Sequence, residues 1–294
     1  MTNERKEWEE VIELKGDAKV YFSIPESIIM NKDLGKKRIA ATSYFLIRKG
    51  LDDKVLLSLN SLSQWYGREP NRHSNGINGR FKSTIEKLKE YNYLSYDDKL
   101  ENKGCIEIVF NTEKYTEECN DKYTRFAVIY LDELKKIVEY TNLKDKEVSI
   151  SDDTLLLVFS YLRMKIYRRR NKLSVSDTSV EQRKLDNPEV YNAYYSDVAN
   201  ELGITLQTLM LSIDTLESLG LVYTETLPRE KKIDSNQQEK WVTNQTLFCN
   251  TYKRERNYML AIGKQYYEDE IDCKKIKLRE LQKSKMNVQV KGGE

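Results

Sequence analysis

The sequence is poor in residues that build metal sites. Its 294 residues contain one histidine, His73, and four cysteines, no two of which have a CxxC spacing. A zinc site would need ligands from scattered positions, and enzymes that hold a metal between paired histidines, including rolling-circle nicking enzymes, are excluded. We therefore expect no metal, no cofactor and reduced thiols.

Two common enzyme motifs are also missing. No GxxxxGK[ST] loop occurs, which argues against a P-loop ATPase or helicase, and no GxSxG elbow is present. Composition alone does not exclude acid–base sites made of carboxylates or serine, but no pattern indicates one. We expect a protein without enzymatic activity.

Long apolar segments are absent as well. No run approaches the roughly 20 apolar residues that cross a bilayer, and the first residues lack the apolar region of a signal peptide. The sequence therefore predicts a cytoplasmic protein with no membrane partner.

The composition that is present suits a helical globular protein. Hydrophobic residues make up 39%, and only 4 prolines and 12 glycines interrupt the chain, which favours long helices. The length suggests about two domains. A net charge of +2 neither requires nor excludes nucleic-acid binding. Whether the chain could bind nucleic acid therefore depends on whether its basic residues cluster.

Two stretches follow one pattern of helix, helix, turn, helix and hairpin. In the first, helical spacing predicts a helix over residues 36–49, followed by an extended piece at 55–57. Ser58 caps a helix that ends at Gly67. A polar loop leads to a helix with a core-facing stripe of Ile77, Phe81, Ile85 and Leu88. A hairpin of residues 93–96 and 106–110 follows.

The second stretch repeats this order. Residues 151–153 cap a long helix, a polar loop covers 171–190, and a helix over 193–202 leads to a tight turn at Gly203. Thr205 caps the next helix, whose stripe is Leu206, Leu209, Ile213, Leu216 and Leu219. Two β-type segments, 221–226 and 241–251, flank a charged tip.

We therefore expect a mainly α fold with small β-wings (α+β), made of two tandem winged helix-turn-helix domains and a C-terminal helix. The predicted parts are an arm (1–18), a first winged-helix domain (19–118), a connector strand and helix (119–150), a second winged-helix domain (151–252), and a C-terminal helix with a basic tail (253–294). Within these, residues 126–130 are a strand, 132–138 a short helix and 111–124 a polar linker.

The first domain has side chains suited to DNA. The helix after a helix-turn-helix turn can enter the major groove, where arginine pairs with guanine and asparagine with adenine. Because the apolar stripe faces the core, Asn78 and Lys82 are expected to share an exposed face near Arg80. Tyr93, Tyr96 and Lys99 would bring the wing to phosphates. The predicted contacts are Arg68, Asn71, Arg72, His73, Asn75, Asn78, Arg80, Lys82 and Lys99. The simpler interpretation is a solvated charged face.

The second domain has cleaner turn spacing but an uncharged recognition helix. Its candidate DNA contacts are Thr205, Gln207 and Thr208, with Leu211 and Ser212 beside them; the alternative is a winged helix that binds only protein. A basic patch ends the long helix before it, with predicted phosphate contacts at Arg163, Lys165, Arg168, Arg169 and Arg170. Basic residues also favour helix C-termini through the helix dipole, so a solvated helix end explains them equally well.

Four segments carry a resemblance to a known family. They are the Tyr21–Pro25 strand, the helix at 58–65, the run from Ile85 to Leu94 into the wing, and the strand at 125–130. Over about residues 19–250 the chain resembles tandem winged-helix replication initiators of plasmids, phages and integrated elements of low-GC Gram-positive bacteria. The resemblance implies origin binding, often as a homodimer, recruitment of a helicase or helicase loader, and association with a plasmid or the bacterial nucleoid.

Three functions remain open from sequence. The leading hypothesis is a protein that binds double-stranded DNA at origin repeats and initiates replication. A transcription regulator would use the same fold at operator repeats. A winged-helix scaffold would bind protein and no DNA.

Overall fold

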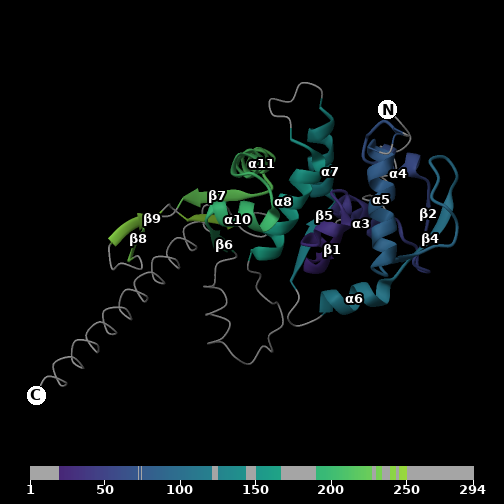
Figure 1. Cartoon of the computed structure of the whole chain (residues 1–294), viewed down its shortest axis with the longest axis horizontal. Coiled ribbons are helices and arrows are strands. Elements are labelled where there is room, and N and C mark those ends of the chain that lie inside the picture. Colours follow the sequence, from purple (N-terminus) through teal and green to yellow (C-terminus); the bar gives the residue numbers. More distant parts are fainter. Residues whose placement is uncertain are drawn as a thin grey trace, which may run out of the picture. The chain divides into compact units, whose positions relative to one another are not determined.

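The computed structural model describes residues 20–71, 73, 75–120, 125–143, 150–166, 190–226, 230–233, 239–242 and 245–249 (Figure 1). The predicted arm, C-terminal helix and tail lie outside the described residues. The fold is mixed α+β, as expected, with small antiparallel sheets. None of the helices in the described part of the chain is long and apolar enough to cross a bilayer.

The chain forms two compact units. One spans the residues up to Lys165 together with Tyr195–Val222, and the other takes Ile166–Tyr194 and the residues from Tyr223 onward.

The first unit begins with strand β1 and a short helix, which precede a segment of helix, strand, two helices and a hairpin. Its elements are β1 (Tyr21–Pro25), α2 (Glu26–Ile29), the 3-10 turn η1 (Lys32–Leu34), α3 (Arg38–Arg48), β2 (Lys54–Leu57), α4 (Leu59–Trp65), α5 (Ile77–Glu90), β3 (Leu94–Ser95) and β4 (Ile106–Phe110). Strand β2 pairs with β4, and β4 pairs with β3, giving the strand order β2-β4-β3. The predicted extended piece and hairpin are thereby confirmed as one three-stranded sheet.

The connector adds a helix that the sequence did not predict. After β4 come α6 (Thr112–Asn120), β5 (Phe126–Tyr130) and α7 (Leu131–Asn142). The expected polar linker over 111–124 is therefore wrong for residues 112–120, where only Tyr115 is buried and the apolar pattern is weak. Strand β5 pairs antiparallel with β1, joining the start of the chain to the connector.

Helix α8 (Asp152–Lys165) is the central helix of this unit. Leu155, Leu156, Val158, Phe159 and Leu162 are fully buried, so the helix is covered on several sides rather than along one stripe. It packs against α3, α7, β5 and α11. The unit is completed by α10 (Tyr195–Leu202) and α11 (Leu206–Ser218), which pack together and against α8.

The second unit contains small antiparallel sheets. Strands β6 (Val190–Ala193), β7 (Tyr223–Thr226) and β10 (Thr246–Cys249) form a sheet of order β6-β10-β7, while β8 (Glu230–Ile233) pairs with β9 (Glu239–Val242). Residues 190–193 were expected to end a loop and begin a helix, and the structure corrects this to a strand. Val190 and Tyr223 pack against the buried Cys249.

The chain thus repeats one order of elements. The order α3–β2–α4–α5–β3–β4 recurs as α8–β6–α10–α11–β7–β10, with the paired strands β8 and β9 inserted between β7 and β10. In each sheet the strand that comes last in the sequence, β4 or β10, is central and pairs with the other two. We call these the first repeat and the second repeat.

Candidate nucleic-acid interface

Helices α4 and α5 pack together in the first repeat and are joined by the loop of residues 66–76. Ser58 caps α4 by accepting a hydrogen bond from the Ser61 backbone N–H at 3.1 Å, as predicted. Helix α5 buries Phe81, Ile85 and Leu88, so most of the predicted stripe is confirmed. Its outward side chains, exposed or half-buried, are Arg80, Lys82, Ser83, Glu86, Lys87, Lys89 and Glu90.

Asn78 does not lie on this outer face. Its side chain is 1% exposed. Its oxygen accepts from Ser63 Oγ at 2.7 Å, and its nitrogen donates to Asn60 Oδ1 and Asn102 Oδ1, each at 2.8 Å. These bonds fasten α5 to α4 and to the loop of the β3–β4 hairpin. The expectation that Asn78 contacts DNA is therefore wrong, because its amide is used in holding these elements together.

The loop between α4 and α5 presents several of the predicted contacts. Asn71, His73 and Asn75 are exposed, and Arg72 lies outside the described residues. Asn71 Oδ1 accepts from the His73 N–H at 3.0 Å, which shapes the loop. The Asn75 carbonyl accepts from Arg80 Nε at 3.1 Å, so the guanidinium stands at the start of α5 while remaining exposed.

A buried charge cluster contacts this pair of helices. Lys37 is 2% exposed and pairs with Asp152 at 3.0 Å and Asp153 at 2.9 Å, with its ammonium 5.3 Å from the Phe81 ring centroid. Half-buried Arg68 approaches Asp152 at 3.6 Å, so one of the predicted DNA contacts is also part of this cluster. Burial raises the pKa of the Asp153 carboxyl to about 6, while the Lys37 ammonium opposes the shift and the Asp152 carboxylate adds to it.

The hairpin loop folds back onto α4. The Leu59 N–H donates to the Glu101 carbonyl at 3.2 Å and the Asn60 N–H to the Asn102 carbonyl at 3.0 Å. These bonds satisfy amide groups at the start of α4 that have no partner within the helix. Lys99 stays exposed on the loop, as its predicted role requires.

The two tyrosines expected on the wing are not free there. Tyr93 is buried, and its hydroxyl donates to Glu118 of α6 at 2.7 Å. Tyr96 is half-buried, with Lys89 Nζ 4.1 Å from its ring centroid. A DNA contact from Tyr93 is excluded by its burial.

The predicted basic patch at the end of α8 also changes. Arg163 is 1% exposed, is hydrogen-bonded to the Glu133 carboxylate and lies 4.8 Å from the Phe159 ring centroid. It is an interior ion pair, so its predicted contact with phosphate is wrong. Lys165 pairs with Glu201 at 3.0 Å, and Arg168, Arg169 and Arg170 lie outside the described residues.

Helices α10 and α11 of the second repeat are joined by a tight turn at Gly203, where the spacing predicts a turn. Gly203 has a φ of 67°, which a side chain would strain, and Thr205 caps α11 by accepting from the Thr208 N–H at 3.1 Å. Gln207 and Thr205 are exposed and Thr208 is half-buried. Ser212, which the sequence placed beside them, is buried and donates to the Thr208 carbonyl at 2.7 Å.

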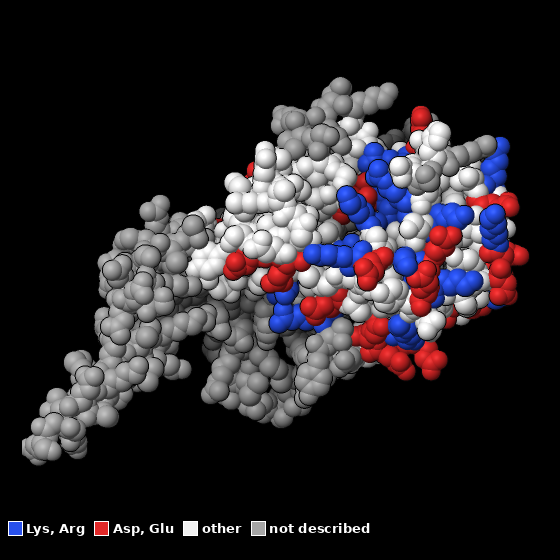
Figure 2. Space-filling model, in the orientation of Figure 1, with Lys and Arg blue, Asp and Glu red and all other residues white. Residues whose placement is uncertain are grey.

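Lys and Arg side chains gather over the upper part of α5 (Figure 2). Residues 68–89, which include the turn and most of α5, contain six Lys or Arg and two Asp or Glu. Lys82 and Lys87 have weak surface partners, Glu86 at 3.9 Å and Glu90 at 2.6 Å, which phosphates can replace at little cost.

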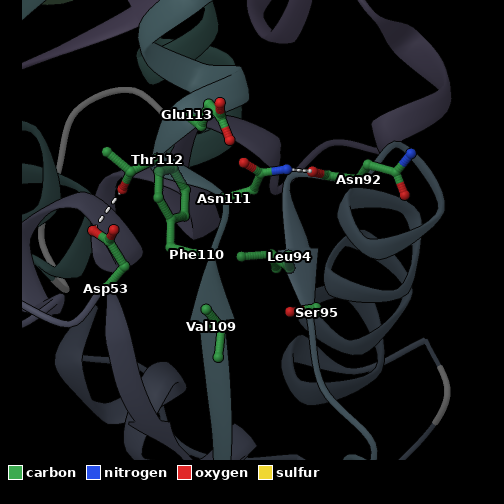
Figure 3. Close-up of a pocket in the computed structure, with 9 residues that line it drawn as sticks. All are labelled: Asp53, Asn92, Leu94, Ser95, Val109, Phe110, Asn111, Thr112 and Glu113. Atoms are coloured by element: carbon green, nitrogen blue, oxygen red, sulfur yellow. Dashed lines mark hydrogen bonds between the residues drawn. The ribbon is translucent and has the colours of Figure 1, made fainter.

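A pocket of about 480 Å³ lies at the other end of α5 (Figure 3). Asn92, which follows α5, lines it together with Asp53, Thr112 and Glu113. Asp53 is engaged there by Lys49 at 2.7 Å and by Thr112 at 2.5 Å. A lining with two carboxylates does not suit phosphate, so this pocket is no part of the candidate interface.

No protein-family model matches the sequence, and no curated protein matches it. The case for a function therefore rests on the chain's own repeat and on the chemistry of its exposed helices.

Proposed function

We propose that the chain binds double-stranded DNA through α5 of the first repeat, as a non-enzymatic replication initiator of a mobile genetic element. The observation that carries the proposal is an order of elements that occurs twice: a helix, a strand, two further helices and two more strands. In each three-stranded sheet, the last strand lies between the other two. That arrangement is the one expected of a winged helix-turn-helix unit, in which the helix after the turn enters the major groove. Two such units in one chain suit origin repeats or an extended origin site.

The first repeat supplies the chemistry. Arg80 stands at the amino-terminal end of α5, where a recognition helix meets base edges, and an arginine there pairs with guanine in two hydrogen bonds. Lys82 and Lys87 on the same helix, and Lys99 on the hairpin loop, are placed for phosphates. Asn71, His73 and Asn75 lie on the exposed loop before α5, where they are available for further contacts.

The test is binding of the full chain to duplex DNA from its flanking locus across a salt series, followed by footprinting. Arg80→Ala is expected to cost about 1–3 kcal/mol and to relax the preference at one base position. Lys87→Ala is expected to weaken binding to all sequences and to reduce the salt slope by about one. Lys135→Ala on α7, also a surface lysine with a partner one turn away, is the control and leaves affinity unchanged.

Weak binding that does not respond to salt would contradict the proposal. The role in replication is tested separately by asking whether the chain, supplied in trans, maintains a plasmid that carries the footprinted site. Binding without maintenance, but with repression of an adjacent promoter, would favour the transcription regulator.

A further inference from the structure

The region of α10 and α11 in the second repeat is acidic, whereas the region of α4 and α5 in the first repeat is basic. Residues 185–228, which include α10 and α11, contain no Lys or Arg and seven Asp or Glu, although the whole chain has 49 basic residues among 294. The corresponding region of the first repeat is basic, as described above. Since the two repeats share their order of elements, this difference distinguishes what their outer helices can bind.

Helix α11 also exposes apolar side chains. Leu206 and Met210, one turn apart, are each 48% exposed, whereas Leu209, Ile213 and Leu216, on the adjacent inward side of the helix, are fully buried. The buried side supplies the core, so the exposed pair is not needed for folding. Leu206 was expected in the core-facing stripe, and the structure corrects this. Figure 2 shows an uncharged surface where Figure 1 places α11.

These features argue against α11 as a DNA-recognition helix. A helix in the major groove lies between two rows of phosphates, which carry one negative charge per about 1.7 Å of duplex. Asp214 is exposed one turn beyond Met210, and Asp197 is exposed on α10. Carboxylates near phosphates are repelled, and no basic side chain on either helix offsets them.

We propose that the outer face of α11 binds protein, namely an amphipathic helix of a partner that carries apolar residues one turn apart and Lys or Arg at their flanks. Two exposed apolar side chains at an i, i+4 spacing are typical anchors for a helix, and a basic flank complements Asp214 and Asp197. The inference rests on the proposed function, because it takes α5 as the DNA-binding helix and assigns only the protein partner to α11.

The test uses the full chain and two fluorescein-labelled synthetic peptides with the same helical leucine stripe, one with lysine and one with glutamate on the polar face. The lysine peptide is expected to bind at least tenfold more tightly. The double variant Leu206→Ala/Met210→Ala and the variant Asp214→Lys are each expected to weaken it, the double variant by about tenfold. Leu56→Ala is the matched control, because Leu56 is 70% exposed on β2 of the first repeat.

Three results would overturn the inference. If the glutamate peptide binds as tightly as the lysine peptide, charge complementarity does not explain binding. If the double variant binds the lysine peptide as tightly as the unaltered chain, the peptide does not bind at Leu206 and Met210. Conversion of a dimer to a monomer by the double variant, measured by sedimentation, makes this face a contact between two copies of the chain instead.

Duplex DNA separates this inference from the proposed function. The double variant is expected to bind DNA within about twofold of the unaltered chain, and a tenfold loss would show that α11 contacts DNA. A chain that binds the lysine peptide through α11 but binds no duplex at low salt contradicts the function proposed for α5 and leaves the protein-docking face standing.

Discussion

At the scale of single residues, two side chains that the sequence predicted to contact DNA, Asn78 and Arg163, are buried in the interior. Asn78 lies three residues before Phe81 on α5, and Arg163 lies four residues after Phe159 on α8. Residues three and four apart share a helix face, so both side chains follow the apolar stripe inward. Their partners, Asn60 and Asn102 for one and Glu133 for the other, come from distant parts of the chain.

The burial of Asn78 gives the first prediction. Asn78→Ala removes three hydrogen bonds and leaves partners without them, so we expect it to lower the free energy of unfolding by about 2–4 kcal/mol. Lys82→Ala, on the outer side of the same helix, is expected to change it by less than about 0.5 kcal/mol. Urea unfolding followed by circular dichroism measures both. Equal stability of the two variants would mean that the amide is not held as described.

The pKa of Asp153 gives a pH prediction. Its folded value of about 6 lies above the ordinary 3.8, so the protonated form is favoured by folding. The associated stability is fully present below about pH 4 and is lost as the pH rises through 6. Asp153→Asn cannot ionise, so its stability relative to the unaltered chain should rise between pH 4 and 7.5, by on the order of 2 kcal/mol.

Chemical unfolding at several pH values tests this, with exposed Asp98→Asn as the control. The charged groups that act on Asp153 are Lys37, Asp152, Arg80 and Arg38, and none of them is altered in the variant. A stability difference that stays constant across the range would contradict the assignment.

At the scale of elements, sequence pattern was most successful where caps and apolar stripes coincide. Helices α4 and α11 begin at Ser58 and Thr205 because each hydroxyl satisfies a free amide, a signal visible in the sequence. Helix α6 was missed because it is mostly polar and buries a single tyrosine. Strand β6 was missed because it is four residues long and lacks alternating burial. Its partner, β10, lies more than 50 residues further along the chain.

The candidate site was predicted less completely than the helices that carry it. Composition and spacing placed Arg80 and Lys82 outside the apolar stripe of α5, and the structure leaves Arg80 exposed and Lys82 half-buried. The sequence pattern could not predict that the hairpin loop folds onto α4. This contact depends on hydrogen bonds from the Leu59 and Asn60 amides to carbonyl groups about 40 positions further along the chain. The exposed pair on α11 was missed in part because Leu206 resembles a core residue in sequence.

The turn between α10 and α11 gives a prediction for Gly203. With a φ of 67° the residue is in the left-handed region, and a Cβ there would also stand 2.6 Å from Lys32 Nζ. The lysine end can move, so the backbone dominates, and Gly203→Ala should cost about 1–2 kcal/mol of stability. Asn200→Ala, at an exposed helical position just before the turn, is the control and should be neutral or slightly stabilising. Thermal unfolding compares them, and equal midpoints would contradict the turn geometry.

At the scale of the whole molecule, the boundaries of the compact units differ from those of the repeats. The sequence divides the chain at residue 151, between two predicted winged-helix domains. In the structure α8, α10 and α11 belong to the same compact unit as the first repeat, while β6, β7 and β10 belong to the other. The reason is α8, whose buried surface contacts α3, α7 and β5 on one hand and α11 on the other.

This arrangement predicts that α5 and α11 unfold together. Ile39 of α3 is 1% exposed, and Ile39→Val should destabilise its unit by about 1 kcal/mol, which speeds exchange through global opening by about fivefold. Hydrogen exchange should therefore accelerate equally for protected amides of α5 and α11, and Ile213→Val in α11 should produce the same pair of changes. Amides of β10, in the other unit, should change much less. Acceleration confined to the repeat that carries the substitution would instead show two independently folding domains, divided where the sequence alone divides them.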